Sequence, residues 1–410
     1  MVSSTIPTGA ITTNSYTSQD QLASTTYSDS TSSVTYQYDP SGQIIQMKDG
    51  TGTSTYSYDP FGDIISTTNG QGQTINYTYD SSGNETSISY SLPTTADTWA
   101  TSPIISYGYD NAGNISDVSD FSGRATTTNY NKDGLPTTTS FGQSQANSGS
   151  SATNSSPSSS APTITNTYDN ADEISSITAS NSSASNSGVI LGFFYLRSPS
   201  GAIASQTNAG AFSSSSSSSS TYLYDHLSRV TQMTNSTSSS TGGSSTGTSS
   251  TYAYDASLNL TTLPNGANGI YDNAGELTSS VIPGTNEPTT YTYNTNGDRT
   301  SSSLSSNSTS APITTSATWN AVNELTSYIS PNTSMTSATY NGEGLRTSAS
   351  FTSASSGTTT EHYLYDQTRS ISNLIMDSTN AYIYENSIAP FEQINLTTGE
   401  VTYLITDATE

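Results

Sequence analysis

The chain has 410 residues, with 32 acidic and 8 basic side chains and a formal net charge of −24 at pH 7. This charge disfavours binding to nucleic acids and to anionic membranes, and the absence of cysteine excludes disulfides, thiolate metal sites and cysteine nucleophiles. Only 30% of the residues are hydrophobic, so a thick aliphatic core is excluded; the abundant Tyr predicts instead a sheet whose inner face is a layer of Tyr.

From the N-terminus onward, one motif recurs: an aromatic residue, any residue, a second aromatic residue, Asp, two further residues and Gly. Repeats on this scale indicate one supersecondary unit copied many times. The four clearest copies supply the candidate structural residues, which are the aromatics Tyr36, Tyr38, Tyr56, Tyr58, Tyr77, Tyr79, Tyr107 and Tyr109 and the turn residues Asp39, Gly42, Asp59, Gly62, Asp80, Gly83, Asp110 and Gly113.

Each copy is predicted to be a β-hairpin. The two aromatics lie two residues apart and therefore point to the same side of a strand, while Thr, Ser or Gln between them point to water. The Asp suits the first corner of a type I turn, because its carboxylate can accept from backbone N–H groups two residues on, and the Gly suits the left-handed fourth position. Such a loop carries a bulge at the Gly.

That turn fixes the strand register. With the Asp as position 0, the aromatic at −1 should lie opposite position +5, which is apolar in most copies. The expected pairs are Tyr38 with Ile44, Tyr58 with Ile64, Tyr109 with Ile115, Tyr168 with Ile174, Tyr224 with Val230, Tyr254 with Leu260, Tyr271 with Leu277, Trp319 with Leu325 and Tyr365 with Ile371.

Copies of the motif continue to near the C-terminus. Their first-corner positions are Asp39, Asp59, Asp80, Asp110, Asn131, Asp169, Ser198, Asp225, Asp255, Asp272, Asn294, Asn320, Asn341 and Asp366, with degenerate copies expected at Thr17 and Glu385. The array predicts an all-β fold in which repeated hairpins form one continuous, spiralling β-strip. We divide it into an N-terminal flank (1–11), a repeat array with Ser/Thr-rich insertions (12–290) and a C-terminal repeat region (291–410).

These residues resemble the YD repeats of the RHS family. The likeness extends over about residues 12–406, and its C-terminal third, including Tyr291–Thr300, Trp319–Thr326, Asn341–Thr347 and Thr398–Leu404, resembles the stretch that leads into the RHS-associated core. The resemblance implies a β-strip that spirals into a shell. In bacterial toxins such a shell encloses a C-terminal toxic domain, and in other members it forms large cell-surface structures.

The chain stops at Asp407–Glu410, where family members usually continue into a core plug and a variable tail. We therefore expect a fragment, or a partial strip that a partner chain completes. The alternating apolar residues of Glu400–Ile405 would then leave an open strand edge that favours self-association. No signal peptide is visible at Met1–Pro7, and the apolar run Val189–Leu196 is too short to span a membrane. The resemblance favours a secreted or cell-surface location.

Ser/Thr-rich stretches occur at 143–161, 179–187, 212–220 and 234–250. Because such segments bury little apolar surface, they are interpreted as long hairpin tips or mobile insertions within the array.

Catalytic interpretations are weaker than structural ones at each candidate position. Asp39–Gly42 and Asp59–Gly62 resemble the paired Asp-Pro-x-Gly elements of RHS self-cleavage, but both fit ordinary repeat turns at the opposite end of the chain. His226 and His362 flank repeat turns, and no nucleophile elbow accompanies the many serines. Asp110–Asn114 lacks the alternating acids of a calcium loop.

The sequence thus predicts a non-enzymatic scaffold without a cofactor, part of an RHS/YD-repeat shell that encloses or presents a C-terminal or partner-borne toxin or effector. The alternative is a cell-surface adhesin or carbohydrate-binding repeat protein, in which exposed Tyr rings would bind sugars. An autoproteolytic or hydrolytic enzyme is the third class. The expected partner is another protein or the missing C-terminal core.

Overall fold

The computed structural model is built from antiparallel β-strands, and it contains no α-helix in the residues it describes, 1–94, 96, 99–144, 161–181, 189–210, 216–239, 246–285, 287–305, 311–385 and 387–408. The all-β prediction is therefore confirmed. Over these same ranges, no helix is long and apolar enough to cross a membrane. Four further turns of the repeat type begin at Ile6, Asn69, Asp120 and Leu263. The Tyr-Asp pattern misses them, although Gly stands at the fourth position of each.

The chain divides into two compact units. Unit 1 comprises 1–96, 267–382 and 394–400, and unit 2 comprises 97–266, 383–393 and 401–410. Both sides of position 290 fall in unit 1, so the compact units do not follow the division at 290, which stays a prediction about repeat type.

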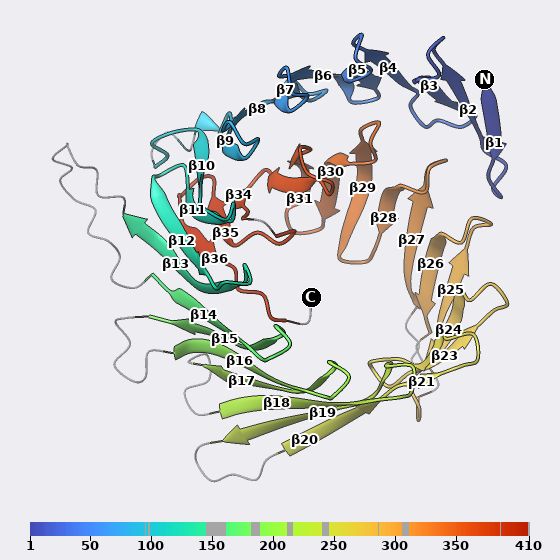
Figure 1. Ribbon diagram of the computed structural model, residues 1–410. Coiled ribbons are helices and arrows are strands. Elements are labelled where there is room, and N and C mark those ends of the chain that lie inside the picture. Colours follow the sequence, from blue (N-terminus) through green and yellow to red (C-terminus); the bar gives the residue numbers. More distant parts are fainter. Residues whose placement is uncertain are drawn as a thin grey trace. The chain divides into compact units, whose positions relative to one another are not determined.

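In unit 1, each strand pairs with its neighbours in sequence within two runs, which Figure 1 shows as successive hairpins. The first run comprises β1 (Val2–Thr5), β2 (Ile11–Tyr16), β3 (Leu22–Tyr27), β4 (Val34–Tyr38), β5 (Ile44–Asp49), β6 (Gly52–Tyr58), β7 (Ile64–Thr68), β8 (Thr74–Tyr79) and β9 (Glu85–Tyr90). The second comprises β23 (Asn268–Tyr271), β24 (Leu277–Val281), β25 (Thr289–Tyr293), β26 (Arg299–Leu304), β27 (Ile313–Trp319), β28 (Leu325–Ile329), β29 (Thr333–Tyr340), β30 (Arg346–Ser353) and β31 (Gly357–His362).

Unit 2 repeats this construction with strands that range from two residues in β21 to ten in β19. Its strands are β10 (Ile104–Tyr109), β11 (Ile115–Ser119), β12 (Arg124–Tyr130), β13 (Pro136–Ser144), β14 (Thr163–Tyr168), β15 (Ile174–Ser180), β16 (Val189–Arg197), β17 (Ile203–Gly210), β18 (Ser216–Tyr224), β19 (Val230–Ser239), β20 (Thr246–Thr251), β21 (Ala253–Tyr254) and β22 (Leu260–Thr262). The C-terminal strands are β32 (Leu364–Asp366) and β33 (Asn373–Met376) in unit 1, β36 (Val401–Tyr403) in unit 2, and β34 (Asn380–Ile383) and β35 (Glu392–Asn395), whose residues are divided between the two.

The strand register follows the repeat motif. Tyr38 lies opposite Ile44 and Tyr58 opposite Ile64, each with a register shift directly before the Tyr. The same pairing joins Tyr109 with Ile115, Tyr168 with Ile174, Tyr224 with Val230, Tyr254 with Leu260, Tyr271 with Leu277 and Trp319 with Leu325. The degenerate copy at Thr17 also forms the turn, since Thr17 N donates to Gln21 O at 2.8 Å.

One predicted pairing near the C-terminus is wrong. Tyr365 pairs with Leu374, and Ile371 is exposed. The copy at Asp366 has Arg369 at its fourth position, which does not adopt positive φ, so the compact turn is replaced by a longer connection. The second position of the turn expected at Glu385 lies outside the described residues, so that copy stays a prediction; the Glu385 carboxylate accepts a hydrogen bond from Thr128 Oγ1 at 2.7 Å.

The Ser/Thr-rich stretches are partly strands, contrary to the prediction of hairpin tips or insertions. Ser216–Ser220 lies in β18 and pairs with Asn235–Ser239 in β19. Cross-strand hydroxyl contacts support the backbone ladder, with Ser219 Oγ 2.7 Å from Ser236 Oγ. The remaining parts of these stretches at 145–160, 182–187, 212–215 and 240–245 lie outside the described residues.

Candidate functional site

The acidic corner of each clear repeat is engaged by its own turn. Asp39 Oδ1 accepts from Ser41 N at 2.8 Å and from Gln43 N at 2.9 Å, and Asp59, Asp80 and Asp110 accept in the same way. The fourth positions have φ of +90° at Gly42, +97° at Gly62, +83° at Gly83 and +87° at Gly113. The carboxylates of Asp39 and Asp59 thus stabilise two separate turns.

In most repeats the aromatic at −1 ties the hairpin to an earlier repeat, a contact that the sequence pattern does not predict. Tyr58 Oη donates to Ile44 O at 2.8 Å, and Ile44 is the +5 residue of the preceding repeat. The same contact is made by Tyr38, Tyr79, Tyr130, Tyr168, Tyr224, Tyr254, Tyr293, Tyr340 and Tyr365, by Trp319 through Nε1 and by Arg197 through Nη2. We call this series the tyrosine ladder.

The aromatics at −3 lie deeper in the sheet. Tyr56 is 8% exposed and Tyr77 is 3% exposed, while Tyr36 and Tyr107 are half-buried. Tyr56 Oη donates to Glu343 Oε1 at 3.2 Å and Tyr77 Oη donates to Asp366 Oδ1 at 3.1 Å. Desolvation and the neighbouring carboxylates raise the pKa of both phenols. These rings therefore join the N-terminal strip, β1–β9, to the C-terminal part of the same unit, and they are not displayed as a sugar-binding face.

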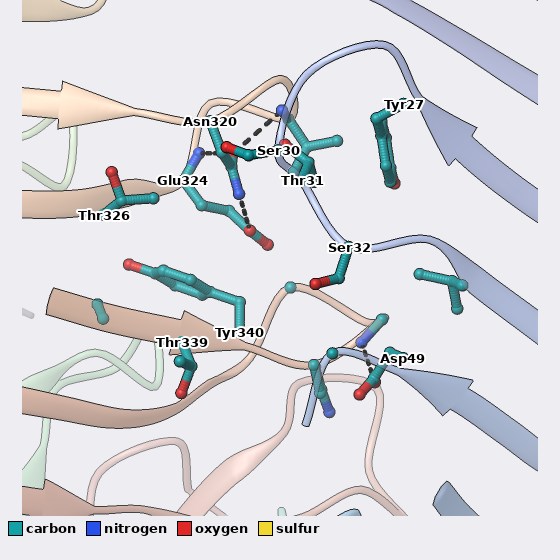
Figure 2. Close-up of a pocket in the computed structure, with 17 residues that line it drawn as sticks. Tyr27, Ser30, Thr31, Ser32, Asp49, Asn320, Glu324, Thr326, Thr339 and Tyr340 are labelled. Atoms are coloured by element: carbon teal, nitrogen blue, oxygen red, sulfur yellow. Dashed lines mark hydrogen bonds between the residues drawn. The ribbon is translucent and has the colours of Figure 1, made fainter. Parts of the chain in front are cut away.

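A polar pocket of about 400 Å³ lies close to this seam in unit 1. Figure 2 shows Tyr27, Ser30 and Asp49 from the N-terminal strip facing Asn320, Glu324 and Tyr340. The pocket has two carboxylates and no cationic lining residue. It lies where the loop between β3 and β4 meets the turns between β27 and β30.

The polar groups of this pocket are largely engaged with the protein itself. Asp49 Oδ2 accepts from Gly342 N at 2.6 Å, Asn320 Nδ2 donates to Glu324 Oε2 at 2.6 Å, and Ala321 N donates to Thr31 Oγ1 at 3.1 Å. Desolvation raises the pKa of Glu324. The arrangement is suited to joining two stretches of chain, and no nucleophile–base pair is formed by these contacts.

The two histidines are not brought into a catalytic arrangement by any contact in the described chain. His226 occupies the second corner of the Asp225 turn, and His362 N, at the end of β31, donates to Ser378 Oγ at 2.9 Å. Within the described residues, no group of three or more His, Asp and Glu side chains is arranged to hold a metal ion. The Asp110 turn is closed by Asn114, whose Nδ2 donates to Asp110 Oδ2 at 3.0 Å.

Comparison with known proteins relates this architecture to toxin complexes. The RHS repeat model matches residues 16–54, 38–74 and 58–95, whereas no curated protein matches the sequence. A mutant Tc holotoxin pore of Photorhabdus luminescens is similar in structure, with a TM-score of 0.64, 12% identity and coverage of 98% of this chain and 22% of that chain. The crystal structure of TcdB2-TccC3 without its hypervariable C-terminal region has a TM-score of 0.51 and 14% identity, and the match covers 98% of this chain and 23% of that one.

At these identities the structural likeness concerns the fold, and the chain spans about a fifth of the length of either neighbour. The RHS repeat matches fall on the hairpins between β2 and β9. Three overlapping RHS repeats thus match between residues 16 and 95, and over nearly its whole length the chain is similar in fold to Tc toxin proteins.

Proposed function

We propose that the chain is a non-enzymatic structural scaffold, part of a secreted or cell-surface RHS shell that encloses or presents a toxin or effector. The single observation that carries the proposal is the tyrosine ladder. Its hydroxyl groups are bonded to the preceding hairpin, so the repeated residues serve to hold the strip together. The likeness to TcdB2-TccC3 supports the toxin context.

The interior contacts support the same proposal. The buried Tyr56 and Tyr77 donate to carboxylates of the C-terminal region, Glu343 and Asp366. A sugar-binding strip would instead expose such rings for stacking. The cargo is expected to be a polypeptide, borne either by a longer form of this chain or by a partner.

The proposal is tested by protection of a fused reporter. The same protease-sensitive peptide is attached to Glu410 in one fusion and to Met1 in a matched fusion, and the rate at which each peptide is cleaved is measured. A shell that encloses C-terminal cargo predicts slower cleavage of the C-terminal reporter. Equal cleavage rates, together with retention of the chain on a glycan surface, would support the adhesin alternative and overturn the proposal.

A further inference from the structure

Phe61 is an exposed aromatic side chain that its turn does not require. It stands at the third corner of the turn between β6 and β7 and is 93% exposed. Its backbone N donates to Asp59 Oδ1 at 2.8 Å. In the neighbouring turns on the same edge of the sheet, Ser41 and Ser82 occupy this corner and make the same backbone contact, also at 2.8 Å. Single exposed apolar residues are ordinary on protein surfaces, so the surroundings of the ring decide whether it belongs to a binding surface.

Two grooves flank Phe61 on that edge of unit 1, each with a volume of about 660 Å³. The groove toward the Asp39 turn is lined by Ile45 of β5, which is 37% exposed. The groove toward the Asp80 turn is lined by Ile65 of β7, which is 39% exposed. Phe61 lines both grooves and separates them. These three apolar side chains and the two grooves are called the Phe61 surface below.

Carboxylates border the Phe61 surface on both sides. Asp39 and Asp59 line the first groove, and Asp59, Asp63 and Asp80 line the second. Within the described chain, the hydrogen bonds that Asp39 and Asp59 accept from their turns all go to Oδ1. Neither Lys nor Arg is among the described residues that line the two grooves. The surface therefore combines exposed apolar groups with negative charge that its own lining does not neutralise.

This charge selects the class of partner. A second copy of the chain brings the same net charge of −24, and nucleic acids and acidic membranes are anionic as well. A segment rich in Lys or Arg is attracted instead. Successive turns on one edge are two strands apart, which places the grooves about 10 Å from each other. A polyproline-II segment matches this spacing, because every third residue returns to the same face after about 9 Å.

We propose that the Phe61 surface binds an extended, Lys- or Arg-rich segment of a partner protein, in which apolar side chains at every third residue enter the two grooves on either side of Phe61. The apolar side chains bury Ile45 and Ile65 together with the ring, and the basic side chains pair with the carboxylates of Asp59 and Asp63. The inference concerns the turn edge of the strip and does not depend on the enclosure of a cargo.

Fluorescence anisotropy tests the proposal on the whole chain. The probe is a labelled peptide, Lys-Leu-Pro-Lys-Leu-Pro-Lys, whose two Leu residues have the spacing of the grooves. Phe61→Ser introduces the residue that the neighbouring turns carry, and it should weaken binding on the order of tenfold. Leu227→Ser is the matched control. Leu227 holds the same corner in unit 2 and is 54% exposed, but Arg229 Nη2 lies 2.6 Å from Asp225 Oδ2 of that turn, so binding should be unchanged.

The charge requirement has its own variant. Asp63→Asn should weaken binding roughly threefold at low salt and much less at high salt, because partly exposed ion pairs are screened. Equal binding by the wild type and Phe61→Ser would overturn the proposal, since it would show only general attraction to an acidic chain. Equal affinity for a peptide with Ser in place of each Lys would overturn it as well.

Sedimentation of the chain alone distinguishes the remaining occupant. The proposal predicts that Phe61→Ser leaves the oligomeric state of the wild type unchanged. Self-association of the wild type that Phe61→Ser abolishes would assign the surface to a second copy and overturn the proposal. Because reporter protection is measured separately, failure of the Phe61 surface leaves the scaffold proposal standing.

Discussion

Replacing Tyr58 by Phe removes one rung of the tyrosine ladder while keeping the ring. The lost contact is the 2.8 Å hydrogen bond from Tyr58 Oη to Ile44 O. A neutral hydrogen bond of this kind contributes about 1 kcal/mol to the free energy of unfolding. Packing of the ring against the neighbouring hairpin should remain, so the expected loss is about 1 kcal/mol, compared with a larger loss for Tyr58→Ala.

Tyr16 offers a matched control within the same chain. It occupies the −1 position of the Thr17 repeat and is 44% exposed, and its hydroxyl makes no hydrogen bond among the described residues. Tyr16→Phe should therefore change the free energy of unfolding by less than about 0.5 kcal/mol. Because each hairpin contacts mainly its neighbours, the losses from Tyr38→Phe, Tyr58→Phe and Tyr79→Phe should be roughly additive.

Denaturant unfolding followed by far-ultraviolet circular dichroism measures these differences. The Phe variants are compared with one common slope of the free energy of unfolding against denaturant concentration. Equal stabilities for Tyr58→Phe and Tyr16→Phe would refute the ladder as a source of stability. A triple variant of Tyr38, Tyr58 and Tyr79 to Phe that is no less stable than Tyr58→Phe alone would show that the hydrogen bonds of the ladder do not contribute additively.

Three further outcomes follow from the turns and the buried acids. Gly62→Ala should destabilise the chain by about 1–2 kcal/mol, because Gly62 has φ of +97°, whereas the control Gly247→Ala, at a strand position without positive φ, should cost less in the same thermal unfolding experiment. Tyr77→Phe should lower stability by about 1–3 kcal/mol, because it leaves Asp366 buried without that donor; an unchanged melting temperature would contradict this. Between pH 5 and 8, the free energy of unfolding should fall as the pH rises, because the pKa of Glu85 is raised from 4.5 to about 7, which corresponds to about 3 kcal/mol at most; a free energy that rises steadily over this range would contradict this. Below pH 4 the trend should reverse, because the pKa values of the turn acids Asp80 and Asp110 are lowered, mainly by hydrogen bonds from Asn84 and Asn114.

Local geometry explains why the hairpins could be predicted from the sequence. The Asp-x-x-Gly turn determines which residues face each other, so Tyr38 and Ile44 are paired by a rule that operates within about ten residues. The rule fails at Tyr365, where Arg369 replaces the Gly and the longer connection places Leu374 opposite the Tyr.

Long-range contacts are a different matter. Nothing in the spacing of Tyr77 indicates that its hydroxyl donates to Asp366, since such a contact depends on how distant hairpins pack. The Ser-rich strand at Ser216–Ser220 was missed for a related reason. Its stability comes from backbone pairing with a long neighbouring strand, and composition records only the lack of apolar side chains.

The most direct test of the scaffold is the double substitution of Tyr56 and Tyr58 by Ala, measured for both stability and glycan retention. Tyr56 is buried and its hydroxyl donates a hydrogen bond to Glu343 Oε1, and the Tyr58 hydroxyl donates one to Ile44 O. The scaffold account predicts a clear decrease in melting temperature and no loss of any specific glycan retention. A melting temperature close to that of the wild type, combined with abolished glycan retention, would contradict it and favour the carbohydrate-binding alternative.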